Sequence, residues 1–348
     1  MAFVQLTSAG DPTLVHWNSP LDRGIVFNAL NSSLNHAIES GEASVFSQPR
    51  WIRALEAHCT GRLWCLLHTS CSLTVARERI DGLALTQDPQ TEALVLIGDL
   101  IRLEERFQQW LLAWYGDLPG VPARSVSVTE FPGFVTRYGP VAEAFPTAYH
   151  FDSVITALGH NAYWTLLLTL RQVIYDHSIH PYVRKNISSH RRNAIRNNLS
   201  ETADALCQTA AYHLTTGLGA TGSNIPMYIA LTWASTWYLK QGDPIKSEFC
   251  CAMTQQERKG STDSPISEDQ TYSDRSRSLD ADGYLARRLV WQDCIGPDHC
   301  VCPPSKGGSV AGVDDRFKER LMDTPETSDS QTNHETNVDK VHDLADLL

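Results

Sequence analysis

The side chains best suited to bind a metal ion lie near the C-terminal end of this 348-residue chain. They are Cys294, His299, Cys300 and Cys302. Zinc requires four soft ligands arranged as a tetrahedron on loops of workable length. Here His299 and Cys300 are adjacent and prolines stiffen the flanking loop, so the spacing fits no usual zinc-binding loop. We therefore predict no metal site and interpret these cysteines as reactive surface thiols.

Histidines are the second group that could do chemistry. His177 and His180 are three residues apart with Asp176 beside the first, and His150 and His160 precede them. A catalytic or metal site would need a second such pair or a carboxylate cluster, which the sequence does not offer. Because the negative end of a helix dipole favours imidazole, helix C-terminal capping explains this pair better. Nucleophile-elbow, phosphate-loop and GxGxxG motifs are also missing, so we predict no catalytic residues, no cofactor and no enzyme activity.

Five basic side chains gather over a short stretch, namely Arg184, Lys185, Arg191, Arg192 and Arg196. Such a cluster could serve as a weak nuclear-import signal or as an anion site near a helix start. A solvated helix face is the alternative, and we favour it.

The last eight residues, VHDLADLL, alternate acidic and aliphatic side chains. The aliphatic positions that would share one edge of an induced helix are Val341, Leu344, Leu347 and Leu348. Segments of this composition fold on a protein partner. We predict partner docking through these four residues, with a frayed acidic terminus as the alternative.

The elements that position these residues are predicted to be five or six helices between Ser19 and about Gln241. Apolar residues recur every three or four positions while polar residues fill the other face. The clearest such stripe is Leu100, Leu103, Phe107, Trp110, Leu111 and Trp114. Further helices are predicted over residues 49–80 with a candidate break at Gly61, 149–177, 188–212 with Ser188 or Ser189 as N-cap, and 225–239.

Two stretches lack this periodicity. Residues 118–140 hold four prolines and three glycines, which predicts a long connector. Beyond Gln241 the chain is polar and rich in Ser and Asp, so it has too little apolar surface to offset ordering entropy. We therefore predict an all-α fold, with one helical domain over residues 1–241 and a mostly disordered acidic tail over 242–348. The expected core includes Leu103, Phe107, Trp110, Trp164 and Leu166.

The charge balance limits the partners. Of the net charge of −11, residues 241–348 supply −9, because they hold 12 Lys and Arg against 21 Asp and Glu. Duplex binding draws most of its affinity from clustered cations, so an acidic chain is not expected to bind specific DNA by itself. No apolar run approaches the roughly 20 residues of a membrane span, and the start lacks a signal-peptide pattern. We expect neither membrane insertion nor secretion.

Three separated patterns resemble one family. They are SPLDRGIVF (19–27), YHFDSVITALGHNAYWTLLLTLRQVIYDH (149–177) and IRNNLSETADALCQTAAYHL (195–214). The residues of these patterns and their order along the chain resemble those of the large C-terminal regulatory region of fungal binuclear-zinc-cluster transcription factors. The resemblance covers roughly residues 15–241. That family's DNA-binding module needs six cysteines in two CxxC-led groups, and this sequence contains no CxxC.

The resemblance implies an all-helical regulatory body, a nuclear or nucleocytoplasmic location, and a part in transcriptional control, often of secondary-metabolite gene clusters. Without the zinc cluster, the chain would act through protein partners, either the transcription machinery or a DNA-binding regulator. A small-molecule ligand of unknown identity stays open. The alternatives are an accessory protein or enzyme of a biosynthetic pathway built on the same helical body, and a non-functional truncated paralogue.

Overall fold

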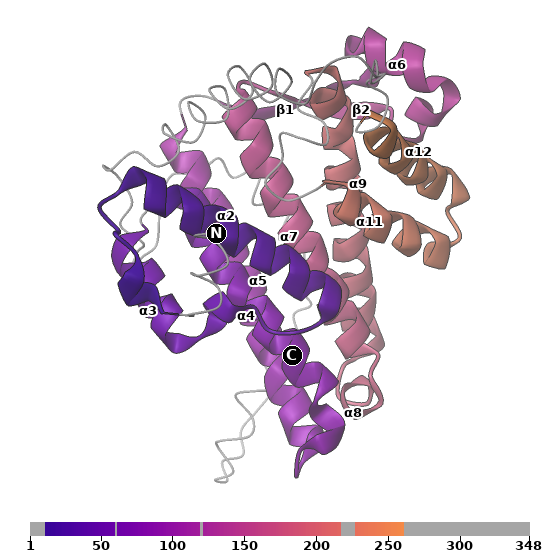
Figure 1. Cartoon of the computed structure of the whole chain (residues 1–348). Coiled ribbons are helices and arrows are strands. Elements are labelled where there is room, and N and C mark those ends of the chain that lie inside the picture. The colour runs from indigo at the N-terminus through magenta and orange to yellow at the C-terminus, as the bar shows by residue number, and fades with distance from the viewer. Residues whose placement is uncertain (1–10, 60, 119–120, 217–226, 261–348) are drawn as a thin grey trace, which may run out of the picture. The chain divides into compact units, whose positions relative to one another are not determined.

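The computed structural model describes residues 11–59, 61–118, 121–216 and 227–260 (Figure 1). Helix accounts for 81% of them, and the strands form one two-stranded sheet. The predicted all-α class is therefore confirmed. These residues contain ten α-helices, more than the five or six expected, because a break near Gly61 divides one predicted span, a short helix lies inside the predicted connector, and two further helices lie outside the predicted spans. The predicted acidic tail lies outside the described residues from residue 261 onward.

The first half of the chain forms four long or medium helices. They are α2 (Pro20–Ser40), α3 (Pro49–His58), α4 (Arg62–Asp81) and α5 (Pro89–Asp117), joined by the short 3₁₀ turns η2 (Val45–Ser47) and η3 (Leu83–Leu85) and preceded by η1 (Pro12–Leu14). The Ser19 side chain caps α2 by accepting from the Asp22 amide, and Gly41 ends it with φ +81°. The predicted break near Gly61 is confirmed, since this glycine separates α3 from α4.

The predicted connector contains regular structure. It forms β1 (Ala123–Ser127), η4 (Val128–Glu130), α6 (Pro132–Tyr138) and η5 (Gly139–Ala144), and β2 (Thr147–Phe151) follows. β1 and β2 are antiparallel, with Ala123 opposite Phe151. The prediction that a helix begins at residue 149 was therefore wrong. Tyr149 to Phe151 pair as a strand, and the Ser153 side chain caps the following helix by accepting from the Thr156 amide.

The remaining helices are α7 (Val154–Ser178), α8 (Pro181–Arg184), α9 (Ser189–Thr215), α11 (Met227–Gln241) and α12 (Pro244–Gly260). Ser188 is the N-cap of α9, as predicted, and accepts from the Arg191 amide at 3.1 Å. α12 lies in the range assigned to the acidic tail, so the helical body extends past the expected boundary at Gln241. Its buried side chains, Phe249, Cys250 and Met253, form a stripe too short to predict within polar sequence.

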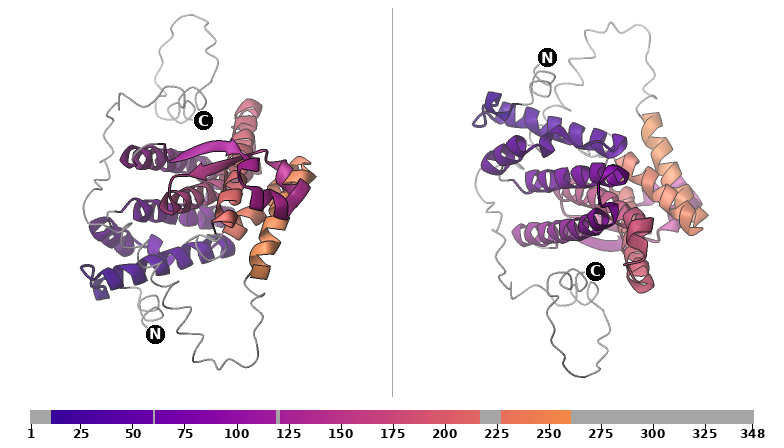
Figure 2. Two further views of the ribbon diagram at one scale, coloured as in Figure 1. Left: turned by 90° about the horizontal axis from the view of Figure 1, so that it is seen from above. Right: turned by 90° about the horizontal axis from the view of Figure 1, so that it is seen from below.

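The core is organised around α7, which packs against α5, α4 and α9 (Figure 1). Its positions are buried on nearly all sides, and Leu166 and Leu170 are fully inaccessible. Of the predicted core residues, Leu103, Phe107, Trp110 and Leu166 are buried and Trp164 is half-buried. In the views of Figure 2, the indigo and violet helices of the first half lie side by side, and the orange α11 and α12 pack against each other, with α11 also in contact with α9.

Three hydrogen bonds tie α5 to α7 along their length. Ala93, Glu104 and Tyr115 on α5 contact His177, Arg171 and His160 on α7, in that order. The order shows that the two helices run antiparallel. The α5 partners are separated by 11 residues, which is about three helical turns, so they lie on one face.

Arg171 is the most buried charged side chain of these ties, with 7% exposure. Its guanidinium donates to the Glu104 carboxylate at 2.6 Å, the Asn198 carbonyl at 2.8 Å and the Thr202 hydroxyl at 2.5 Å. It therefore joins α5, α7 and α9. Among the residues that the structure describes, every helix is too short or too polar to span a membrane.

Replacing Leu166 by Ala should lower the free energy of unfolding by about 2 to 5 kcal/mol, because this fully buried side chain would leave a cavity at the centre of α7. Leu112→Ala is the matched control: Leu112 is 51% exposed on α5, and its loss should change stability by less than about 0.5 kcal/mol. Urea unfolding measures both. Equal effects of the two substitutions would show that the α7 face is misplaced.

Candidate functional site

Two groups of predicted site residues lie outside the described residues. They are the candidate ligands Cys294, His299, Cys300 and Cys302, and the docking positions Val341, Leu344, Leu347 and Leu348. Within the described ranges, no group of three or more His, Cys, Asp or Glu side chains is arranged to hold a metal ion.

The histidines at the end of α7 form structural contacts. His177 is buried, and its Nε2 donates to the Ala93 carbonyl of α5 at 2.8 Å, while burial lowers the pKa of this imidazole. His180 is the N-cap of α8 and accepts from the Tyr182 amide. The expected role at a helix end therefore takes a different form: one imidazole bonds a neighbouring helix and the other caps the next one.

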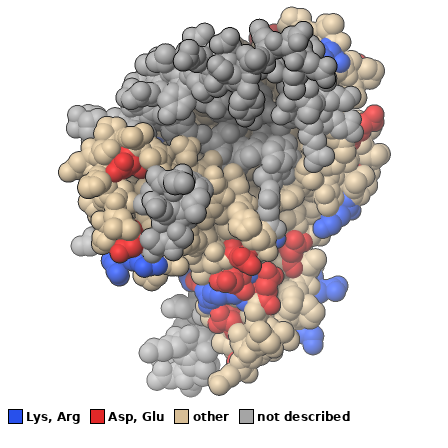
Figure 3. Space-filling view, viewed as in Figure 1, with Lys and Arg blue, Asp and Glu red and all other residues tan. Residues whose placement is uncertain are grey.

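The predicted basic cluster lies at the turn from α8 to α9. The Arg192 guanidinium donates to the carbonyls of Arg184 and Ile187, which closes this turn. The other four cations of the cluster are exposed. On the face drawn in Figure 3, acidic and basic groups are interspersed over its lower part. Ion pairs join Arg79 to Glu92 and Asp99, and Asp99 to Arg102.

A cluster of aromatic and imidazole rings lies between α5, β2, α7 and α9. His160 shares a 3.0 Å hydrogen bond with the Tyr115 hydroxyl, and both His160 and His213 pack against Phe151. Burial lowers the pKa of His160 to about 3 and that of His213 to about 4. A Tyr–His pair can relay protons where water reaches it. Here His160 and His213 are buried and the Trp114 ring covers Gly159, the residue next to His160, while Tyr115 at the edge of the cluster is half-buried.

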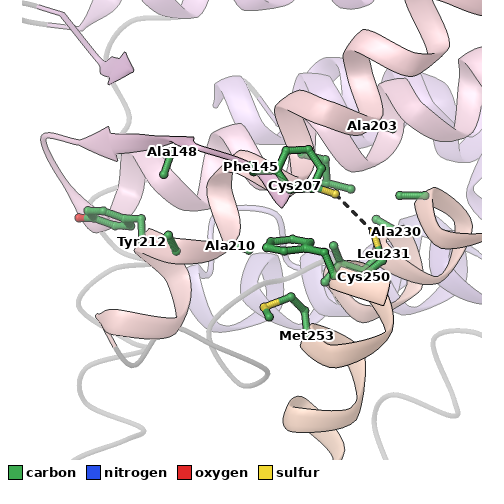
Figure 4. Packing of buried hydrophobic residues seen from close by; sticks show 14 of the residues in the cluster. Phe145, Ala148, Ala203, Cys207, Ala210, Tyr212, Ala230, Leu231, Cys250 and Met253 are labelled. Atoms are coloured by element: carbon green, nitrogen blue, oxygen red, sulfur yellow. Dashed lines mark hydrogen bonds between the residues drawn. The ribbon is translucent and has the colours of Figure 1, made fainter. Parts of the chain in front are cut away.

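The second cluster is a pair of cysteines that sequence reasoning missed. Cys207 on α9 and Cys250 on α12 are buried, and their sulfurs are 3.5 Å apart (Figure 4). The contact with Cys207 and burial raise the pKa of the Cys250 thiol. These residues are 43 positions apart without a CxxC motif, so no local signal identifies the pair. Such a pair can bind a soft electrophile or become a disulfide.

A charged network borders the cysteines. Asp204 on α9 accepts from the Tyr238 hydroxyl at 2.7 Å and from the Lys246 ammonium at 2.7 and 2.9 Å. The same ammonium lies 5.3 Å from the Phe145 ring centroid and 5.4 Å from that of Tyr238. Burial and the adjoining acidic groups raise the pKa of Tyr238, so this phenol remains a donor. The network fixes α11 and α12 against α9 beside the two thiols.

A pocket of about 490 Å³ opens between α6 and the end of α9. It is lined by Glu130, Phe131, Pro132, Gly133, Phe134, Arg137, Tyr138, Leu214 and Thr215. Three of the nine lining residues are aromatic, and the exposed ion-forming groups are Glu130 and Arg137, so the pocket suits a small, partly apolar molecule. The sequence predicted no site here because seven of the nine lining residues fall in the predicted connector, far in the chain from Leu214 and Thr215.

Gly159→Ala should destabilise the fold by about 1 to 3 kcal/mol, because an added Cβ would lie 2.4 Å from the Trp114 ring. Gly24→Ala on α2 is the control, since a Cβ there meets nothing within 4 Å and alanine favours a helix interior. That variant should be neutral or slightly more stable. Urea unfolding compares them, and a harmless Gly159→Ala would contradict the close packing of α5 on α7.

Acid should weaken the fold before the carboxylates titrate. The pKa of His213 is lowered in the folded state from its usual 6.5 to about 4, so the unfolded chain takes up protons first. Stability is therefore retained above pH 6.5 and lost as the pH falls toward 4, by about 1.4 kcal/mol per pH unit for this group.

His213→Gln should reduce the loss of unfolding free energy between pH 6.5 and 4.5 by about 2 to 3 kcal/mol. The exposed His190→Gln serves as the control and should leave the pH profile unchanged. Urea unfolding at half-unit pH steps gives the profile. Parallel profiles for wild type and His213→Gln would show that this imidazole is not buried in its neutral form.

No protein-family model, curated protein or solved structure matches this chain. A function is therefore proposed from the described side chains together with the three sequence patterns.

Proposed function

We propose that this chain is a regulatory protein of the transcription-factor type that lacks a DNA-binding module and acts through protein contacts. Its partners would be the transcription machinery or a DNA-binding regulator. The proposal includes a nuclear or nucleocytoplasmic location and a role in the control of a secondary-metabolite gene cluster. It rests on the resemblance to the regulatory region of fungal binuclear-zinc-cluster factors.

The observation that carries the proposal is where the three resembling patterns lie. Residues 19–27 are the N-cap and first turns of α2, residues 149–177 include the end of β2 and almost all of α7, and residues 195–214 form most of α9. α7 packs along α9, and α4 contacts both α2 and α7. Two of the three resembling patterns therefore lie in the central helix pair of the body, α7 and α9, and the third begins α2, which packs on α4; this arrangement supports the proposal of an all-helical regulatory region.

The buried polar side chains support a scaffold role. Arg171 joins three helices, His177 joins α7 to α5, and Lys246 with Tyr238 joins α12 and α11 to α9. Each of these side chains forms its hydrogen bonds with a neighbouring helix. A body of this kind holds a shape for partners to recognise, which favours regulation by contact over catalysis by these side chains.

A second candidate function is supported by the pocket at α6. A regulator or accessory protein of a biosynthetic pathway could bind a small molecule there, between aromatic walls and beside Arg137. The two candidate functions use the same helical body and differ in what it binds, a small molecule here and a protein partner in the first.

The proposal predicts that the full chain, tethered to a foreign DNA-binding domain, activates a reporter gene. Removing residues 339–348 should lower the activity about tenfold, because an apolar helical edge at a protein interface is worth a few kcal/mol at most. Leu347→Ala should lower activity in the same direction, and His342→Ala, off that edge, is the matched control.

Thermal unfolding of the purified variants serves as the check on folding, since the deletion should leave Tm unchanged. A silent tethered chain would contradict transcriptional regulation by this protein. Activity that survives the deletion would instead remove the terminal segment from the mechanism and leave the body as the contact surface.

A further inference from the structure

The sulfurs of Cys207 and Cys250 are in close contact, and the proposed function does not account for this contact. They are 3.5 Å apart and come from different helices, α9 and α12. A disulfide bond is about 2.05 Å long, so modest side-chain rotation would bring them to bonding distance. We propose that Cys207 and Cys250 are a redox modification site at which a hydroperoxide forms a disulfide that links α12 to α9.

The surroundings of Cys250 favour Cys207 over Cys251 as its disulfide partner. Cys250 points into the core formed with Phe145, Ala203 and Met253, whereas the neighbouring Cys251 is exposed and contacts the Ser235 hydroxyl at 3.3 Å (Figure 4). Adjacent cysteines on one helix point in different directions, and a disulfide between them would distort the backbone. The inward thiol therefore has Cys207 as its natural partner.

The other described cysteines lie elsewhere in the fold. Cys59 follows α3, and Cys65 and Cys71 are on α4; none of the three is in a disulfide. Cys71 is as buried as Cys207 and directs its thiol to the Leu67 carbonyl of its own helix. Burial alone is therefore common to several cysteines, and the sulfur–sulfur contact singles out one pair.

One hydroperoxide molecule is enough to oxidise the two thiols to one disulfide. One cysteine sulfur attacks the outer peroxide oxygen, the O–O bond breaks, and the remaining alkoxide or hydroxide takes a proton and leaves as an alcohol or water. The resulting sulfenic acid is then attacked by the second thiol, which forms the S–S bond and releases water. The two thiols lose two electrons and the peroxide gains them. A dithiol reductant reverses the change by thiol–disulfide exchange.

Burial makes the reaction depend on the position of α12. Both thiols are nearly inaccessible, and the raised pKa of Cys250 keeps it protonated while α12 is seated. Oxidation therefore requires α12 to open transiently from α9. Once formed, the bond closes a loop that includes α11 and fixes the seated arrangement beside Asp204, Tyr238 and Lys246.

The test treats the reduced full-length chain with hydrogen peroxide, blocks remaining thiols with N-ethylmaleimide, and maps non-reduced peptides by mass spectrometry. We expect one cross-linked peptide that contains Cys207 and Cys250, lighter by two hydrogen atoms than the reduced pair. Because a loop of this size is constrained, Tm should rise by about 5 to 10 °C and return to its starting value with dithiothreitol.

Four single variants provide the controls. Cys207→Ala and Cys250→Ala should lose the Tm rise, while Cys251→Ala and the buried Cys71→Ala should keep both the rise and the cross-link. Peptide mapping of the wild type decides the matter even if an alanine variant fails to fold. The proposal is overturned if both sulfurs stay reduced, if they pass to sulfinic acid without a cross-link, or if another cysteine replaces either one in the disulfide.

Discussion

The arrangement of the helices depends on the burial of one cation, the Arg171 guanidinium in the middle of α7. A charge removed from water must find all its partners nearby, and losing one of them costs several kcal/mol. Here the partners come from two other helices: the Glu104 carboxylate of α5, and the Asn198 carbonyl and Thr202 hydroxyl of α9. A slide of either helix by one turn, about 5.4 Å, would break these bonds. Hydrophobic burial holds the helices together, and this cation sets their register.

The same register is fixed at both ends of the α5–α7 pair. His177 bonds the Ala93 carbonyl at one end, and His160 bonds Tyr115 at the other. Near the second end, Trp114 lies on Gly159, where any larger residue would push α5 away. Burial lowers the pKa of the imidazoles of His160 and His213, which favours their neutral form. A central helix buried on nearly all sides is thus positioned by a few polar contacts, which explains why its charged and imidazole side chains serve structure.

Much of the fold follows from local sequence, and the rest depends on contacts between distant segments. The stripe through Leu103 and Phe107 predicts α5 because one face is apolar, and Ser188 predicts the start of α9 because its side chain caps it. α7 is buried on nearly all sides, so its contact faces are not predictable from periodicity. β2 forms only because β1 pairs with it, and α12 folds around three apolar side chains. The Cys207–Cys250 contact could not be predicted from the sequence for the same reason, since it depends on how α12 packs against α9.

α9 contacts α7 on one face and α12 on another. Thr202 faces α7 and accepts from Arg171, whereas Cys207, five residues later and therefore about 140° around the helix, faces α12. Asp204 lies between them and holds Lys246 and Tyr238. Because Thr202 and Cys207 are five residues apart, about 7.5 Å along the helix axis, the Arg171 contacts and the thiol pair lie on neighbouring turns of α9. A disulfide between Cys207 and Cys250 would therefore form beside the contacts that set the register of the helices, and α9 is the element that carries both.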